Sequence, residues 1–325
     1  MVMKDVLRLI ISLVMLTSVQ MTTVWAQNYP NKPIRMLVGF ATGGSTDIVA
    51  RLVGQKISEQ LGQPIIVENR SGAAGSIAIE KVTASSPDGY TLLMLAGSQV
   101  VQASMVRKLP YDLVRDLAPV SLVVTGPVVM VVHPSVPADT VEKLIAYARS
   151  QPGKLSYASD GVAGVQHLAG ELFKMMAKVD IVHVPFKGGS EGPVAVAAGQ
   201  VQIGVPSITG ALPLMASGKL RALAVSSMKR ASSLPSVPTL HESGLSGYDF
   251  SSWQGLAAPA GLPKALVARL NAAVSKAVNT SDVRETLSKQ GREVDTGTPE
   301  QFGTFIRNEM AKNDRLIKFV GLKVE

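Results

Sequence analysis

The sequence contains no cysteine and few aromatic or charged residues. Of its 325 residues, 17% are charged and 5% are aromatic, whereas an average soluble domain is about 25% charged. The absence of cysteine excludes a disulfide scaffold and any zinc or iron–sulfur site built on cysteine. The scarcity of aromatic residues argues against a stacking platform for single-stranded nucleic acid. What the chain has instead is 46% hydrophobic residues and 29 glycines, which indicates a folded globular protein.

Basic residues outnumber acidic ones, but they do not cluster. The formal net charge is +8, and the densest basic spots are the pairs Arg107-Lys108 and Lys229-Arg230. Without a basic stripe we expect no nucleic-acid partner. A dispersed positive charge suits a small anionic ligand instead.

The first 26 residues have the pattern of a secretory signal peptide. Lys4 and Arg8 precede an apolar stretch over residues 9–19, and Val24-Trp25-Ala26 supplies the residues before a cleavage site. The apolar stretch is short for a membrane span of about 20 residues, although an uncleaved anchor is the alternative. We expect cleavage after Ala26, which leaves a soluble exported chain with a net charge of +7 because Lys4, Asp5 and Arg8 are lost.

Strand and helix patterns alternate along the rest of the chain. Apolar strands at residues 34–38, 65–67 and 91–96 are separated by helical patterns over 47–61 and 76–85. This order predicts a parallel sheet covered on both faces. A second unit begins near Pro127, the last third of the chain is predicted to be helical, and the length suggests about two domains.

Metal-binding and nucleotide-binding motifs are absent from the sequence. None of the four histidines lies in an H-E-x-x-H motif, and there is no G-x-x-x-x-G-K-[ST] or G-x-G-x-x-G motif. We therefore expect no catalytic residues, no metal and no cofactor. A secreted hydrolase or lyase stays as a low-weight alternative, because serine, histidine and aspartate are plentiful.

Two glycine-bearing loops lead from a strand into a helix. The first is Gly39–Asp47 and the second is Ser159–Gly164, with His167 in the helix that follows. Glycine lets backbone N–H groups approach a ligand, and a helix N-terminus attracts anions. Two such loops in separate units would face each other across a cleft suited to a small carboxylate. An ordinary tight turn is the alternative for the first loop, and Asp47 is as well suited to capping its helix as to ligand contact.

Ordered blocks along nearly the whole chain resemble the tripartite tricarboxylate transporter receptors, also called Bug proteins. The blocks that carry the resemblance are residues 29–35, 43–47, 61–64, 67–73, 87–92, 108–112, 167–173, 182–188, 218–225, 258–261 and 298–302. The resemblance implies a type II-like periplasmic binding protein fold, with two α/β domains joined by crossing strands. It places residues 27–127 and 251–325 in domain I and 128–250 in domain II.

The resemblance also implies an interdomain ligand site and a role for the chain. It predicts a monomeric periplasmic receptor, not an enzyme, that captures a carboxylate and delivers it to membrane transporter subunits. A ligand sensor of the same fold is the alternative. The residues predicted to line the cleft come from both loops and from segments after two strands: Phe40, Thr42, Gly43, Gly44, Ser45, Thr46, Asp47, Gly97, Ser98, Gln99, Ser159, Asp160, Gly161, Ala163, Gly164, Val165, Gln166, His167, Pro206 and Ser207.

One departure from the family pattern bears on the class of ligand. Many members carry an aspartate where this chain has Pro206, so an anchor for a ligand amine is missing there. A buried ammonium group without a partner is costly. Asp160 either replaces that anchor or caps the following helix. We therefore expect a carboxylate without an amine, such as a di- or tricarboxylate or an aromatic acid.

Overall fold

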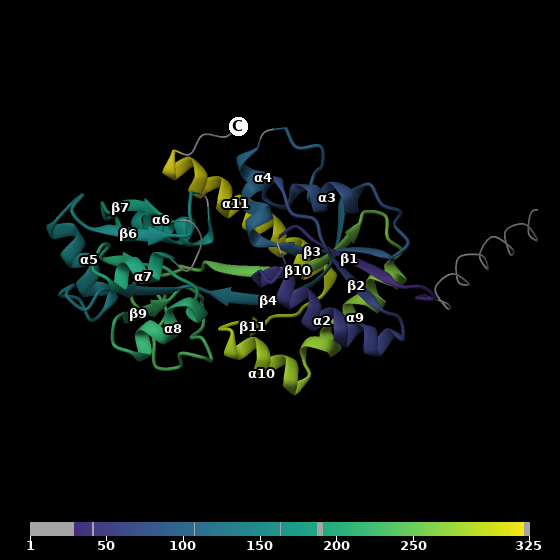
Figure 1. The fold of residues 1–325 in the computed structure, drawn as a ribbon. Helices are drawn as coiled ribbons and strands as arrows, with labels where there is room; N and C mark the ends of the chain where they lie inside the picture. The colour runs from purple at the N-terminus through teal and green to yellow at the C-terminus, as the bar shows by residue number, and fades with distance from the viewer. Residues whose placement is uncertain (1–28, 41, 107, 163, 187–190, 322–325) are drawn as a thin grey trace, which may run out of the picture.

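The computed structural model describes residues 29–40, 42–106, 108–162, 164–186 and 191–321. The chain forms two mixed sheets flanked by helices, and long strands run from one sheet towards the other (Figure 1). The two-sheet α/β fold expected from the sequence is therefore confirmed. In these described ranges, no helix is long and apolar enough to span a membrane.

The larger sheet has six strands in the order β11-β4-β10-β3-β1-β2. Strands β2, β1 and β3 are parallel as predicted, but β10 lies antiparallel between β3 and β4. The parallel sheet predicted from these three strands is confirmed, and β10 joins it antiparallel because it re-enters the sheet from the opposite direction. The six strands are β1 (Ile34–Val38), β2 (Ile65–Asn69), β3 (Thr91–Ala96), β4 (Leu117–Pro127), β10 (Ser251–Pro259) and β11 (Glu293–Val294).

The smaller sheet has five strands in the order β7-β6-β8-β5-β9. Strands β7, β6 and β8 are parallel, and β5 is antiparallel to both of its neighbours. The five strands are β5 (Val129–Val132), β6 (Ser156–Ser159), β7 (Val182–Pro185), β8 (Ile203–Gly204) and β9 (Arg221–Val225).

The helices cover the sheets and begin where the sequence signals place them. Thr140 caps α5 by accepting a hydrogen bond from the Lys143 N–H, and Thr298 and Gln301 form a capping box on α11. The helices are α2 (Ser45–Leu61), η1 (Ala73–Gly75), α3 (Ser76–Thr83), α4 (Gly97–Met105), α5 (Val141–Ser150), α6 (Val165–Ala177), α7 (Glu191–Ala197), α8 (Ile208–Ala216), α9 (Lys264–Val278), α10 (Ser281–Lys289) and α11 (Pro299–Val320).

Strands β4 and β10 connect the two sheets. β4 ends at Pro127, and β5 begins two residues later in the other sheet. β10 returns beside it, with Ser251 paired to Pro127 and Pro259 paired to Leu117. The domain limits at residues 127 and 250 stay a prediction, which this change of sheet supports.

Helix α11 also reaches both sheets. Near its start, Phe302 is buried with Trp253 of β10, and near its end Leu316 is buried in the core of the smaller sheet with Phe173. Between them, the Lys312 ammonium donates to the Asp249 carbonyl, 3.3 Å away, just before β10 begins. The placement of residues 251–325 in domain I stays a prediction: α9 and α10 pack in the core of the larger sheet, whereas the end of α11 packs in the core of the smaller one.

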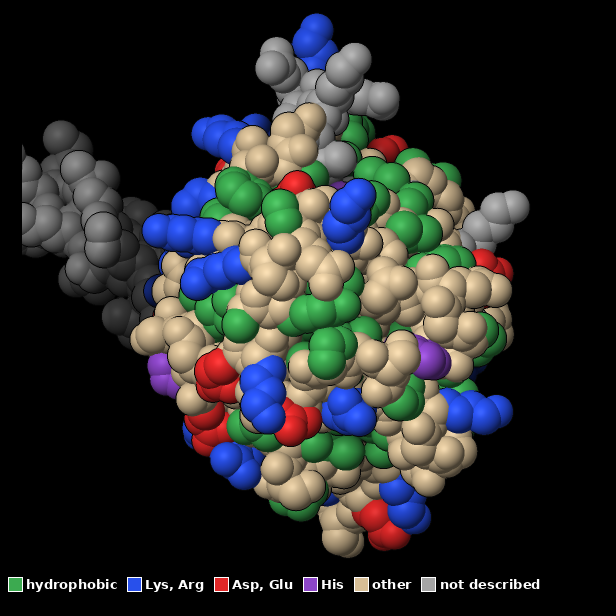
Figure 2. Space-filling view, turned by 90° about the vertical axis from the view of Figure 1, so that its left-hand side faces the viewer, with side chains coloured by type: hydrophobic (Ala, Val, Ile, Leu, Met, Phe, Trp, Pro, Cys, Tyr) green, Lys and Arg blue, Asp and Glu red, His purple; other side chains and the backbone are tan. Residues whose placement is uncertain are grey.

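The face of the molecule at the smaller sheet's end carries no single basic patch among the described residues. Figure 2 shows that Lys and Arg side chains are spread from the top to the bottom of this face, with acidic side chains among them. This distribution matches the dispersed charge of the sequence.

Gly255 of β10 gives a test of how α11 docks on the larger sheet. A Cβ atom added at Gly255 would lie 2.2 Å from Cζ of Phe302, so we expect Gly255→Ala to lower the free energy of unfolding by about 1–3 kcal/mol through overpacking. Phe302→Leu should also destabilise the protein, because it removes buried ring atoms. Urea denaturation should show that the double variant loses less free energy of unfolding than the two single variants lose when their losses are added. Additive losses would contradict the close packing of these two residues.

Candidate functional site

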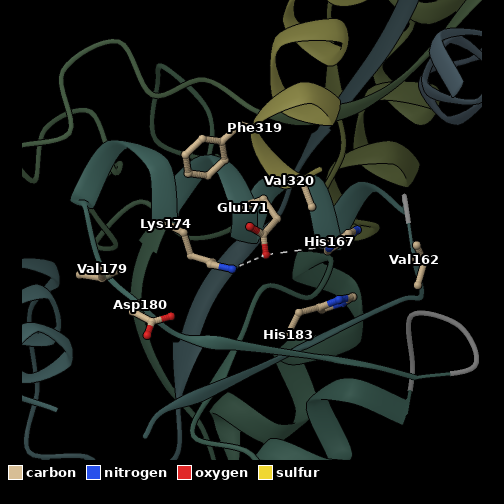
Figure 3. A pocket seen from close by; sticks show the side chains of 9 residues that line it. All are labelled: Val162, His167, Glu171, Lys174, Val179, Asp180, His183, Phe319 and Val320. Atoms are coloured by element: carbon tan, nitrogen blue, oxygen red, sulfur yellow. Dashed lines mark hydrogen bonds and ion pairs between the residues drawn. The ribbon is translucent and has the colours of Figure 1, made fainter. Parts of the chain in front are cut away.

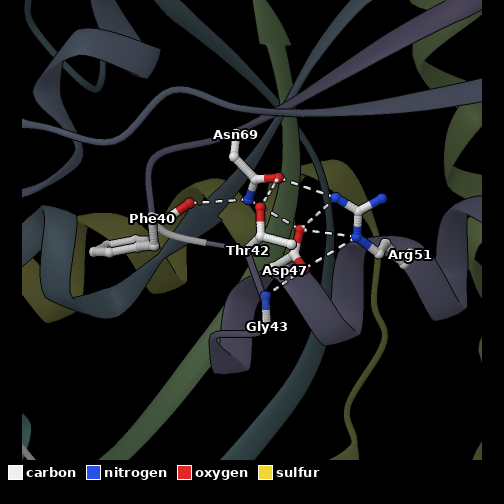
Figure 4. Close-up of polar contacts among 6 residues, drawn as sticks. All are labelled: Phe40, Thr42, Gly43, Asp47, Arg51 and Asn69. Atoms are coloured by element: carbon white, nitrogen blue, oxygen red, sulfur yellow. Dashed lines mark hydrogen bonds and ion pairs between the residues drawn. The ribbon is translucent and has the colours of Figure 1, made fainter.

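The first predicted loop joins β1 to α2 and is held by a polar network (Figure 4). Asp47, in the first turn of α2, is 1% exposed. Its carboxylate accepts hydrogen bonds from the Gly43 N–H at 2.8 Å, the Asn69 amide at 2.9 Å and the Arg51 guanidinium at 3.0 Å. The Asn69 amide also donates to the Phe40 carbonyl at 2.9 Å, and Thr42 Oγ1 lies 3.1 Å from Asn69 Oδ1.

This network shows which atoms of the first loop are already engaged. Burial opposes ionisation of Asp47, but hydrogen bonds from Arg51, Gly43 and Asn69 outweigh it and hold the pKa of the carboxyl below its usual value. The contacts assign Asp47 to holding the loop, in place of the ligand contact expected from the sequence. Gly44 is the N-cap residue of α2 and has no side-chain cap, Thr46 is buried, and Ser45 is exposed. Gly44 and Ser45 are therefore the parts of this loop best placed for a ligand.

In the second predicted loop, Asp160 occupies the N-terminus of α6. Its Oδ1 accepts a hydrogen bond from the Gln166 N–H at 3.1 Å. A Cβ atom at Gly164 would lie 2.1 Å from the same oxygen, so glycine is needed there for the carboxylate to approach. Burial raises the pKa of Asp160, although backbone hydrogen bonds from Gln166 and its neighbours oppose the rise. Asp160 therefore caps α6, which was one of the two roles left open by the sequence.

The other residues of the second loop are partly engaged within their own unit. Ser159 is fully buried, and its hydroxyl lies 2.6 Å from His183 Nε2 and accepts from the Gly161 N–H at 3.2 Å. Gly164 is the N-cap residue of α6 and Val165, half-buried, is its first residue. Ala163 lies outside the described residues.

The segment Gly97–Gln99, expected to line the cleft after the third strand, is the first turn of α4. Gln99 is 1% exposed and turns inward, because it accepts from the Ala96 N–H at 2.9 Å and donates to the Gly75 carbonyl at 3.0 Å. Gly97 packs beneath the Trp253 ring, where a Cβ atom would lie 2.8 Å from Nε1. The contacts of Gln99 and Gly97 thus run against the expected cleft-lining role, and Ser98, which is half-exposed, is the residue of this segment that keeps it.

Pro206 and Ser207 lie at the start of α8. The Pro206 carbonyl accepts from the Val129 N–H at 2.9 Å, and the Ser207 hydroxyl caps α8 by accepting from the Gly210 N–H at 3.3 Å. Their polar groups thus serve the local fold, while the exposed position of Ser207 leaves it accessible.

His167 lines a separate cavity of about 500 Å³ beside α6, β7 and the end of α11 (Figure 3). Its ring stacks on His183 with 3.9 Å between centroids. Burial, followed by the neighbouring His183, lowers the pKa of His167 to about 4, so the ring is neutral at pH 7. Glu171, on the same wall, is paired with Lys174 at 2.9 Å. No described group of three or more histidine, aspartate or glutamate side chains is arranged to hold a metal ion.

Arg292 is a functional candidate that the sequence did not reveal. It follows Gly291 after α10, and its guanidinium donates to Ser45 Oγ of the first loop and to Gln254 Oε1 of β10. The same segment touches the smaller sheet's unit, because the Thr209 hydroxyl donates to the Gln290 carbonyl. A Cβ atom at Gly126 would lie 3.6 Å from Arg292 Nη1. Arg292 thus lies where β4 and β10 leave the larger sheet, next to Ser45.

The charge of Arg292 has no acidic partner in the described parts of the chain. No described carboxylate forms an ion pair with its guanidinium, and its two acceptors, Ser45 and Gln254, are neutral. Burial lowers its pKa to about 10, which still leaves it a cation at pH 7. The sequence carried no signal for this residue, since an arginine after a helix-ending glycine is unremarkable. Asn69, by contrast, had a signal in the sequence, because it is a polar residue at the end of a parallel strand beside the first loop.

Comparisons with known proteins agree with this architecture. Residues 49–322 match the model of a family described as "Tripartite tricarboxylate transporter family receptor". Protein BugT of Bordetella pertussis is 34% identical over 304 residues, which cover 93% of each chain. Among solved structures, R. palustris Rpa4515 with adipate is 33% identical with a TM-score of 0.75, covering 90% of this chain and 98% of its own. MatC from Rhodopseudomonas palustris, with bound malate, is 34% identical with a TM-score of 0.70, and the match covers 89% of this chain and 100% of MatC.

Asp47 gives a test of the loop network through pH. Because the native pKa of Asp47 is lowered, its stabilising contribution is present above the unfolded-state pKa of about 3.9 and is lost as pH falls through the native value. We expect Asp47→Asn to lower the free energy of unfolding by about 1–3 kcal/mol at pH 7. The difference from the unsubstituted protein should shrink as pH falls below about 4.

The measurement is urea denaturation at pH 7, 5 and 3.5. Glu142→Gln is the matched control, because Glu142 is also an acidic residue in the first turn of a helix but is exposed. It should change stability by no more than about 0.5 kcal/mol. A loss in Asp47→Asn that stayed constant across this pH range would show that the charge of Asp47 does not hold the loop.

Proposed function

Because this chain belongs to the tripartite tricarboxylate transporter receptor family, we propose that it binds a small carboxylate between its two sheets and delivers it to a membrane transporter. The observation that carries this proposal is the match over about nine-tenths of the chain to relatives solved with adipate and with malate. The proposal assigns the chain a binding role without a chemical step.

The proposed site uses groups that both units present at the surface. These are the N-terminus of α2 at Gly44 and Ser45, the half-exposed Ser98 and the exposed Ser207. Backbone N–H groups at a helix start and neighbouring hydroxyls are suited to a carboxylate. Since these groups lie on elements of both sheets, we propose that the ligand draws the two units together by a hinge motion at the crossing strands.

The setting of the receptor follows from the same relatives. One solved relative, 30% identical, is described as the periplasmic binding protein BugD. We propose that this chain is likewise exported, with cleavage after Ala26, and that it works as a monomer. The resulting net charge of +7 would favour encounter with an anion at low ionic strength.

Native mass spectrometry of freshly purified mature protein tests the function itself. We expect a bound small molecule that is released on denaturation and has the mass of a carboxylic acid. Isothermal titration with that acid should reproduce its binding to protein that was unfolded, dialysed and refolded. A retained neutral or cationic molecule, or one that is chemically converted on incubation, would contradict the proposal.

Gly44→Val tests the part of the first loop assigned to the ligand. Gly44 has φ −71° and ψ 163°, which valine adopts without strain, so the variant should fold. The added side chain should obstruct the helix N-terminus and weaken binding of the retained acid at least tenfold by titration calorimetry. Thr280→Val is the control, since Thr280 is the N-cap residue of α10 and has similar angles of −69° and 146°, and this variant should bind the acid normally. Normal binding by Gly44→Val would remove this loop from the site.

A further inference from the structure

Arg292 carries a positive charge that the described protein does not neutralise. Its guanidinium has five N–H donors, and the described residues supply acceptors for two of them, both neutral. Taking a cation out of water is expensive unless an anion pairs with it. Arg292 is half-buried and lies next to Gln254, which is 4% exposed, so this cost applies to its guanidinium.

The location of Arg292 adds to this cost. It bonds Ser45, the first residue of α2, where the helix dipole is positive. The acidic residue of that turn, Asp47, is directed instead to Gly43, Arg51 and Asn69. The start of α6 already holds the carboxylate of Asp160. Arg292 is therefore a cation at the start of α2, beside the crossing strands, with which no described carboxylate pairs.

We propose that Arg292 binds the second carboxylate of a dicarboxylate ligand, and that it makes this receptor selective for diacids over monoacids and amino acids. This inference rests on the proposed function and names its ligand class. The planar guanidinium fork matches a carboxylate through two parallel hydrogen bonds. Since Arg292 touches Ser45, a short diacid can reach the guanidinium with one end while the other end stays at the loop.

The same geometry disfavours the competing ligands. A monoacid of equal length leaves the guanidinium without its anion and places an apolar end beside it. An α-amino acid brings an ammonium group beside the Arg292 guanidinium, while Asp47 and Asp160 already accept hydrogen bonds from backbone N–H groups. Repulsion between this ammonium group and the Arg292 guanidinium disfavours binding of the amino acid, whereas attraction between the guanidinium and a carboxylate favours binding of the diacid.

Titration calorimetry with matched acids tests the inference. The probes are succinate, glutarate and adipate, each paired with the monoacid of equal length (butyrate, pentanoate and hexanoate), with aspartate and glutamate as the amino-acid counterparts. We expect at least one diacid to bind the refolded protein at least tenfold more tightly than its monoacid and its amino-acid counterpart. Arg292→Gln should weaken binding of that diacid about 10- to 100-fold, the range of a charge-assisted hydrogen-bond pair, and leave monoacid affinity within about twofold.

Two further variants separate charge at the site from other effects. Arg292→Lys keeps the charge without the fork, and we expect intermediate affinity for the diacid. Arg284→Gln removes a charge from exposed Arg284 on α10, whose guanidinium donates to Asn279, and should leave diacid binding unchanged. If Arg292→Gln has a lower melting temperature, binding is compared below the unfolding range of both proteins.

The outcomes distinguish this inference from the proposed function. Equal affinity for diacids and monoacids, or an equal loss of both in Arg292→Gln, would overturn the role of Arg292 while leaving a carboxylate receptor. Tighter binding of aspartate or glutamate than of the plain diacids would overturn it as well. Failure of every acid to bind, together with a retained molecule that is not an acid, would overturn the proposed function and this inference with it.

Discussion

The pairing of β4 with β10 is the constraint on which the rest of the structure depends. These two strands pair from Leu117–Pro259 to Pro127–Ser251, with register shifts after Gln254 and after Leu256, and both leave the larger sheet at the same end. They fix where the two sheets can stand relative to each other, and they place Gln254 and Gly126 beneath the guanidinium of Arg292. Helix α11 adds a second connection, since it is buried against one core at Phe302 and against the other at Leu316. A hinge motion has to bend the strands and shift this helix together.

The polar groups near the crossing divide into two kinds. Asp47 and Asp160 are carboxylates of the chain itself that satisfy backbone N–H groups at loop and helix starts. They make the loops rigid, and they take up donors that a ligand would otherwise use. Arg292 is the opposite case, a cation supplied with neutral partners. The protein thus satisfies these loop and helix starts with its own carboxylates and leaves a positive charge at the junction, which is the basis for proposing an anionic ligand with two charged ends.

Local signals in the sequence predicted most helices and the parallel strands, because capping residues and apolar periodicity are local properties. The Thr298–Gln301 capping box and the strands at 34–38 and 91–96 are examples. β10 was missed in a region read as helical, since its position between β3 and β4 depends on residues more than 120 positions away. The loops of the site were recognisable from glycine and strand-to-helix order. The inward turn of Gln99 and the meeting of Arg292 with Ser45 were not, because both arise from tertiary packing across distant segments.

The most direct test of this account is a crystal structure of the mature protein with the diacid that binds most tightly. The account predicts that the ligand lies between the two sheets, with one carboxylate at the start of α2 and the other about 2.7–2.9 Å from the Arg292 guanidinium. A ligand bound instead in the cavity beside His167, or an Arg292 that still bonds only Ser45 and Gln254, would contradict it.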